Sequence, residues 1–141
     1  MTGLVAFMSA DKGRSVKTTQ PFTKGQLVCD YPGDLINKRE AKKREKRYTK
    51  EGKGCYMFFF SRQAKNYCLD ATAETPFFGR LINHSKHKYN LEARSCIVSD
   101  VPTIRFYAID NLPAQTELLF DYGHRNSPLE KSEDHLLFLN Y

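Results

Sequence analysis

Residues 79–85 read GRLINHS, and residues 117–123 read ELLFDYG. In each run, polar side chains directly follow apolar ones: Asn83, His84 and Ser85 in the first, Asp121 and Tyr122 in the second. His84 and Ser85 would suit a hydrolase triad with a distant aspartate, but the chain lacks the GxSxG nucleophile elbow. The four histidines also lack the HExxH spacing of zinc enzymes. Spacing alone therefore predicts only a β-rich domain with polar groups at these two places.

The segments around these two runs are short and rich in β-branched and aromatic residues. One helix is predicted over residues 38–49, because Asn37 is a favourable N-cap and two glycines follow the helical pattern. Composition and turn residues predict strands over 16–19, 27–31, 55–60 and 66–70, and a hairpin over 95–108 that turns near 100–102. We therefore expect a mainly β single domain with one clear helix.

The chain has 141 residues, of which 40% are hydrophobic and 27% charged, as in an ordinary globular domain. Its apolar runs are four to five residues long, and its polar start does not resemble a signal peptide, so we expect a soluble, intracellular protein without a membrane segment. The four cysteines show no close pair, which predicts reduced thiols and no metal site.

The net charge of +6 is concentrated between Lys38 and Arg47, where seven cations face two glutamates. Such a run favours an acidic partner such as nucleosomal DNA. An ordinary solvated helix face, with Glu40 paired to Arg44 one turn later, explains the same residues equally well. A dedicated nucleic-acid-binding protein has only this run in its favour, because the chain shows no DNA- or RNA-binding signature.

Four runs together resemble the SET domain in their order along the chain: KGR at residues 12–14, GCYM at 54–57, GRLINHS at 79–85 and ELLFDYG at 117–123. The stretches 31–36, 41–45 and 67–72 look most like the branch that methylates lysine-20 of histone H4. The resemblance implies a SET-domain fold of short curved sheets, in which a pseudoknot-like C-terminal crossing brings Asn83 and His84 beside Phe120 and Tyr122. It also implies domain limits: a short N-terminal segment over 1–11, then the SET domain with a short C-terminal flanking segment over 12–141.

The resemblance implies an S-adenosylmethionine-dependent protein-lysine N-methyltransferase that acts on a histone, with histone H4 lysine-20 in nucleosomes as the expected substrate. Such an enzyme is expected to be a monomer in the nucleus, on the chromosome, and to need no metal. The alternative is a catalytically weak SET-like module that binds histone tails.

Residue roles are also implied by the resemblance. Tyr122 is expected to be catalytic, assisted by Tyr31; without the resemblance, Tyr122 would be taken for an ordinary core tyrosine. The expected cofactor-binding residues are Lys12, Gly13, Arg14, Tyr56, Asn83 and His84. The expected substrate channel consists of Tyr31, Cys55, Phe120 and Tyr122.

Three positions depart from the related branch. Ser15 stands where the branch has glycine in the first turn. The branch has a tryptophan near its C-terminus, whereas this chain has no tryptophan and carries residues 136–138 in that region. Phe120 stands where the branch, which stops at one methyl group, has tyrosine. A phenylalanine offers no hydrogen bond to a water beside the amine, so the space for a second methyl group opens. The comparison with the related branch therefore predicts dimethyl-lysine as the product, with trimethyl-lysine as the alternative that the hydroxyl of Tyr31 disfavours.

Overall fold

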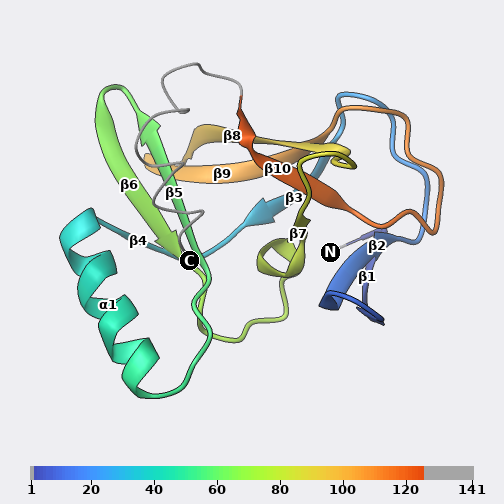
Figure 1. The fold of residues 1–141 in the computed structure, drawn as a ribbon. Coiled ribbons are helices and arrows are strands. Elements are labelled where there is room, and N and C mark those ends of the chain that lie inside the picture. The colour runs from blue at the N-terminus through green and yellow to red at the C-terminus, as the bar shows by residue number, and fades with distance from the viewer. Residues whose placement is uncertain (1, 126–141) are drawn as a thin grey trace.

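Three small sheets surround a central core in the computed structural model, which describes residues 2–125 (Figure 1). The two-stranded sheet pairs β1 (Leu4–Ser9) with β2 (Gly13–Thr18). The five-stranded sheet has the order β3 (Leu27–Tyr31), β9 (Val101–Ala108), β8 (Leu91–Val98), β10 (Leu119–Arg125) and β7 (Asn83–His84). The three-stranded sheet has the order β4 (Asp34–Ile36), β6 (Lys65–Asp70) and β5 (Met57–Arg62). The mainly β prediction is confirmed.

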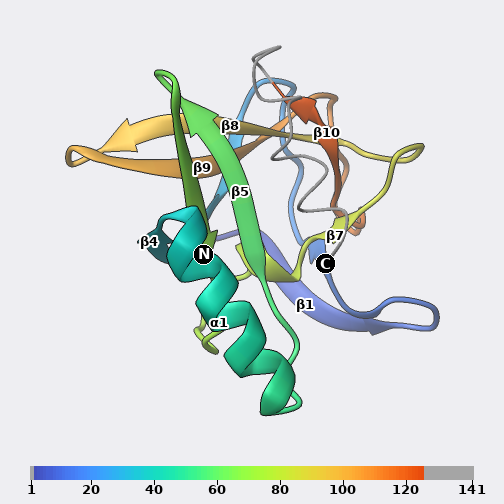
Figure 2. The same ribbon diagram turned by 60° about the vertical axis from the view of Figure 1, so that its left-hand side comes forward.

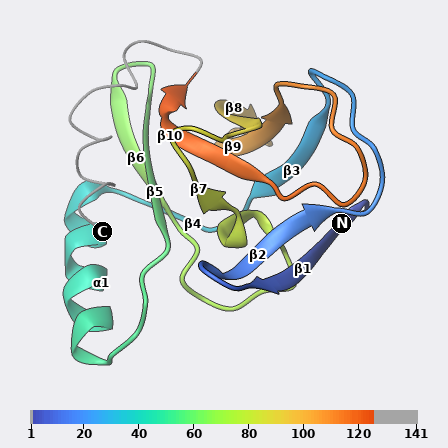
Figure 3. The ribbon, with the colours of Figure 1, turned by 45° about the vertical axis from the view of Figure 1, so that its right-hand side comes forward.

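The expected C-terminal crossing is present, because β10 lies between two strands that precede it in the chain (Figure 3). β10 runs parallel to β7, with Phe120 opposite His84, and parallel to β8, with Phe120 opposite Leu91. The backbone N–H of Ser85 donates to the carbonyl of Phe120 at 2.9 Å. Parallel neighbours require long connections, so this pairing joins segments that are far apart in sequence.

The apolar run of β5 is buried on both faces of its strand. Because side chains alternate along a strand, Phe58 and Phe60 join the central core, whereas Met57 and Phe59 pack towards the helix α1 (Lys38–Lys50). Burial of each aromatic ring contributes about 1.5–3 kcal/mol. This run therefore joins the helix to the core.

The helix α1 begins where the sequence predicts, because the side chain of Asn37 accepts a hydrogen bond from the backbone of Glu40 at 2.8 Å. It lies along the outside of the three-stranded sheet (Figure 2). Arg44 turns towards that sheet and contacts Glu40 at 3.0 Å and Asp70 at 3.0 Å. The predicted pairing of Glu40 with Arg44 is confirmed. Within residues 2–125, no helix has the length and apolar character needed to cross a membrane.

Four strands are absent from the sequence-based prediction: β1, β4, β7 and β10. β1 pairs along its whole length with β2, which itself begins at Gly13 rather than at residue 16. β4 has three residues and pairs with β6. Neither β1 nor β4 has a clear alternation of burial, so their pairing partners define them rather than a local pattern. The β8–β9 hairpin also turns slightly earlier than expected, at Ser99 and Asp100, both with positive φ.

A single glycine brings the GRLINHS run against the core. Gly79 begins the short 3-10 turn η1 (Gly79–Leu81), and a Cβ atom there would collide with the carbonyl oxygen of Asp30 in β3. Any larger residue would push η1 away from β3. This close approach determines where β7, the next strand, meets β10.

Candidate active site

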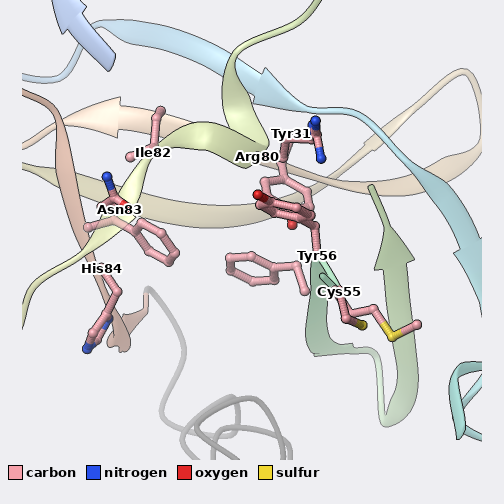
Figure 4. A pocket seen from close by; sticks show the side chains of 10 residues that line it. Tyr31, Cys55, Tyr56, Arg80, Ile82, Asn83 and His84 are labelled. Atoms are coloured by element: carbon pink, nitrogen blue, oxygen red, sulfur yellow. The ribbon is translucent and has the colours of Figure 1, made fainter. Parts of the chain in front are cut away.

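A cavity of about 270 Å³ lies where β3, β5, β7 and β10 meet (Figure 4). In Figure 4, Tyr31, Arg80, Tyr56 and Cys55 gather on one side, and Ile82, Asn83 and His84 on the other. Six residues predicted from the sequence line the cavity: Tyr31, Cys55, Tyr56, Asn83, His84 and Phe120. The rest of the lining consists of Met57, Phe58, Arg80 and Ile82. The fold thus brings together residues that are up to 89 positions apart in the chain.

The base of the cavity is aromatic. Phe58 stacks on Phe120 with ring centroids 6.0 Å apart, and Tyr31 lies 5.3 Å from Phe58. Burial raises the pKa of Tyr31 far above its ordinary value, so its hydroxyl stays neutral. Such a wall disfavours a charged ammonium and favours a neutral amine.

Cys55 forms part of the rim as a neutral thiol. Burial, followed by the negative charges of Asp70 and Glu45, raises the pKa of Cys55 to about 11. A thiol with so high a pKa is a poor nucleophile at neutral pH. Its geometry suits a lining residue rather than a covalent catalyst.

Asn83 joins the cavity to the first turn. Its Nδ2 donates to the carbonyl of Arg14 at 3.1 Å and to the hydroxyl of Ser15 at 2.9 Å. Both amide protons are therefore engaged, and the Oδ1 atom remains as an acceptor. Ser15 is fully buried, so the residue that departs from the related branch is accommodated by this bond.

His84 is held in one tautomer by β10. Its Nδ1 accepts the backbone N–H of Tyr122 at 3.1 Å, so the ring proton resides on Nε2. The side chain of Asp121 lies 3.9 Å from the same nitrogen. The motif residues predicted to meet at the crossing therefore do so.

Tyr122 lies behind the cavity. Its side chain is fully buried, and its hydroxyl donates to the backbone carbonyl of Phe59. Its ring contacts Phe58 edge-on, with centroids 4.6 Å apart. Tyr122 is not among the described residues that line the cavity; it contacts Phe58 and Phe120, which do line it.

A second, polar cleft of about 570 Å³ adjoins the cavity, and the two share Tyr56 and Arg80. Four cations line the cleft: Arg14, Arg47, Lys53 and Arg80. The carboxylate of Glu74 lies among them. The guanidinium of Arg80 lies 4.4 Å from the centre of the Tyr56 ring. Hydrogen bonds from Arg14, followed by the close ion pair with Arg80, lower the pKa of Glu74 to about 2.

The first turn supplies the remaining predicted residues. Arg14 lines the polar cleft. Lys12 pairs instead with Glu117 at 3.5 Å and is not among the described residues that line the cavity or the cleft. Gly13 has a φ of +76°, so the turn itself requires glycine. No protein atom lies within 4 Å of the position that a Cβ atom would take there.

Two members of the Arg14–Glu74–Arg80 cluster of ion pairs escaped the sequence-based prediction. Arg80 is part of the GRLINHS run, which was the signal available, yet only its neighbours in that run were assigned a role. Glu74 lies in a segment without a motif, and only the folded chain brings it to Arg14. Within residues 2–125, no group of three or more His, Cys, Asp or Glu side chains is arranged to hold a metal ion.

The family model described as SET domain matches residues 13–123 of the chain. N-lysine methyltransferase KMT5A-A of Danio rerio is 42% identical over 125 residues, which cover 88% of this chain and 36% of that protein. Histone-lysine N-methyltransferase Set8 of Drosophila melanogaster is 42% identical over 116 residues, which cover 82% of this chain and 17% of that protein. The chain thus spans less than two fifths of the length of these two relatives.

A solved structure shows the same fold. CpSET8 from Cryptosporidium superimposes with a TM-score of 0.81 at 37% sequence identity, covering 87% of this chain and 58% of that one. The similarity therefore covers most of this chain.

Proposed function

This chain belongs to the SET-domain family, and on that premise we propose that it is an S-adenosylmethionine-dependent protein-lysine N-methyltransferase that acts on histone H4 at lysine-20. The relatives above are named as lysine methyltransferases, one of them as a histone-lysine enzyme. The observation that carries the proposal is the convergence of Asn83, His84 and Phe120 on one aromatic cavity through the β7–β10 crossing.

The residues present fit an amino-acid sulfonium cofactor. Arg14 and Arg80 offer guanidinium groups to a carboxylate, and Arg80 is buried with Nε lacking a hydrogen-bond partner among the described residues. The Oδ1 atom of Asn83 is an acceptor for an ammonium group. We assign cofactor binding to Lys12, Gly13, Arg14, Tyr56, Asn83 and His84, as the resemblance implies. When bound, S-adenosylmethionine supplies an electrophilic methyl group.

The cavity prepares the substrate amine. A free lysine has a pKa of about 10.4, so roughly one amine in a thousand is neutral near pH 7. The aromatic wall of Phe58, Phe120 and Tyr31 removes water from the ammonium, which lowers its pKa. The buried charge of Arg80 acts in the same direction. The hydroxyl of Tyr31 then orients the neutral amine along the line of attack.

Tyr122 is the second tyrosine of the proposal. Its bond to the carbonyl of Phe59 fixes the direction of the hydroxyl, and a tyrosine oxygen is itself a hydrogen-bond acceptor of the kind that would orient an amine. Because Tyr122 is fully buried, it acts on a lysine only after the adjoining rings move aside. This burial favours one second candidate, a catalytically weak module that holds a histone tail.

One experiment separates the two candidates. The wild-type protein is incubated with S-adenosylmethionine and either nucleosomes or free histone H4, and the products are followed by mass spectrometry. We expect methylation of lysine-20. If the protein binds an H4 peptide and S-adenosylhomocysteine but forms no methylated product, the result would support the second candidate, the module that holds a histone tail.

We further propose that α1 contacts nucleosomal DNA and that the domain acts as a monomer on the chromosome, in the nucleus. Five of its cations line a shallow groove on the helix: Lys38, Arg39, Lys42, Lys43 and Lys46. Arg44 faces the sheet and Arg47 lines the polar cleft, so neither belongs to this basic face. Phosphate contacts by such a face would weaken as salt increases.

A charge reversal tests the DNA contact. Lys42→Glu with Lys43→Glu is expected to reduce methylation of nucleosomes about tenfold while methylation of a short H4 peptide stays near wild type. The matched control reverses Lys24 and Lys65, two exposed lysines away from α1. Equal losses on nucleosomes and peptide would contradict the DNA contact.

A further inference from the structure

The segment between β6 and η1 places a carboxylate in the polar cleft. Glu74 lies in this connection, which has no regular secondary structure, and its side chain is 69% exposed. Both its oxygens face Arg14, with Nη2 to Oε1 at 3.0 Å and Nη1 to Oε2 at 3.4 Å. The Nη2 atom of Arg80 lies 2.6 Å from Oε1. Two guanidinium groups thus hold one exposed carboxylate.

The two arginines differ in how firmly they are held. The side chain of Arg80 is only 3% exposed, stacks on Tyr56 and is within hydrogen-bonding distance of the carbonyls of Ala71 and Thr72. Its Nη2 is close to Glu74 but not aligned for a hydrogen bond, and its Nε has no partner among the described residues. Glu74 therefore neutralises this buried cation without using its directional donors.

The surroundings leave Glu74 replaceable. It is the one carboxylate among the described residues that line a cleft with four cations. Because Tyr56 and Arg80 line both hollows, a ligand with its carboxylate in the cleft can reach the aromatic cavity with its other end. A ligand carboxylate that meets the aligned donors of Arg80 would satisfy groups that Glu74 leaves unused.

The geometry points to Glu74 as an internal competitor: its carboxylate occupies the Arg14–Arg80 pair and is displaced by the carboxylate of the bound cofactor. This inference rests on the proposed function, since it takes the amino-acid end of S-adenosylmethionine as the displacing group. Glu74, which lies outside the motif runs, would thereby control the affinity for the cofactor.

The inference predicts a gain of affinity on removal of a charge. Glu74→Gln keeps the shape of the side chain but weakens its hold on the arginines. Apparent affinity falls with the fraction of molecules whose site is free, so a pair free in about one molecule in five predicts about fivefold tighter binding in the variant. The measurement is isothermal calorimetry with S-adenosylhomocysteine at low and high salt, with the larger gain expected at low salt.

Two controls isolate the carboxylate. Glu51→Gln removes the same charge from a residue that pairs with Lys53, on the rim of the cleft but away from the arginine pair, and is expected to bind as wild type does. The ligand 5′-methylthioadenosine lacks the amino-acid end, so its affinity should be the same for wild type and Glu74→Gln.

The outcomes are distinct. Tighter binding of S-adenosylhomocysteine by Glu74→Gln alone, including the case in which wild type binds too weakly to measure, supports the inference. Unchanged or weaker binding by the variant, while wild type binds, overturns it and leaves the proposed function standing. Equal gains for 5′-methylthioadenosine also overturn it, because the carboxylate would then not matter. Absence of binding by both proteins, with both folded by circular dichroism, overturns the cofactor proposal and this inference with it.

Discussion

The aromatic cavity and the polar cleft beside it share a wall of Tyr56 and Arg80, yet their chemistry is opposite. The cavity is lined mainly by rings and apolar side chains, with hydroxyl, thiol, amide and imidazole groups and a single cation, Arg80, on the shared wall. The cleft gathers four cations around one carboxylate. A charged group loses solvation in the first, whereas an anion is attracted by the second.

In the proposed reaction, this difference would let one small domain treat the cofactor and the substrate amine separately. The cleft can hold a ligand by charge, and the cavity can hold a reacting amine without charge. Arg80 belongs to both, because its guanidinium attracts an anion on one side and disfavours an ammonium on the other. Variants on either side of the shared wall test whether the cavity and the cleft each keep their own role.

The largest effect is expected from Tyr122→Phe, behind the cavity. If the hydroxyl orients the amine, methyl transfer falls about 100-fold or more with little change in affinity for the H4 peptide or the cofactor. Single-turnover kinetics and calorimetry measure the two quantities. If the hydroxyl only supports Phe59, the variant should instead lose thermal stability and keep most of its rate.

The next effect concerns Asn83, where the cavity meets the first turn. Asn83→Ala removes the bonds to Arg14 and Ser15 and leaves the Ser15 hydroxyl without that partner. The variant also removes the Oδ1 acceptor proposed for the ammonium group of the ligand. A buried polar group left unpaired costs about 1–3 kcal/mol, so affinity for S-adenosylhomocysteine should fall about 5- to 150-fold. Calorimetry checks this. Unchanged affinity would mean that only the cleft, and not this amide, determines cofactor binding.

A smaller effect concerns the support behind the shared wall. Burial by itself would raise the pKa of Asp70, but hydrogen bonds from Tyr48, Thr72 and Arg44 outweigh it, and the pKa is lowered. A lowered pKa in the folded state means that the ionised group stabilises the fold above its unfolded pKa of about 3.9, and that this contribution is lost as the pH falls through the folded pKa.

The pH dependence of Asp70→Asn tests this support. The variant should lose about 1–3 kcal/mol of unfolding free energy at pH 7, and the difference from wild type should shrink below about pH 4. Urea denaturation at a series of pH values measures it. A difference that stays constant down to pH 3 would show that packing rather than the charge of Asp70 is responsible.

The smallest effect in rate, though not in product, is expected from Phe120→Tyr in the cavity wall. The wild-type protein is expected to form dimethyl-lysine, because Phe120 offers no hydrogen bond to a water beside the amine. The added hydroxyl should hold such a water and shift the product towards monomethyl-lysine, a choice that needs only about 1–3 kcal/mol. A mass-spectrometric time course in which wild type stops at one methyl group would refute this.

The sequence alone determined a large part of the architecture, and particular residues show why. Asn37 caps α1 where expected, and the run from Met57 to Phe60 is buried because its composition allows both faces to be covered. Caps, apolar runs and turn residues act over a few positions, so they can be identified without knowledge of the fold. The two motif runs identified the family, and the roles that the resemblance implies for individual residues remain proposals.

Only the tertiary structure decided what pairs with what. Asn83 donates to Ser15 across 68 positions, and Arg14 holds Glu74 across 60. The crossing of β10 turns Tyr122 against Phe59, and Gly79 allows η1 to approach β3 closely. These contacts depend on loop closures and strand pairings between distant segments, which leave no local pattern in the chain. The sequence therefore determined which groups are present, and the fold decided that a mainly apolar cavity and a basic cleft share one wall.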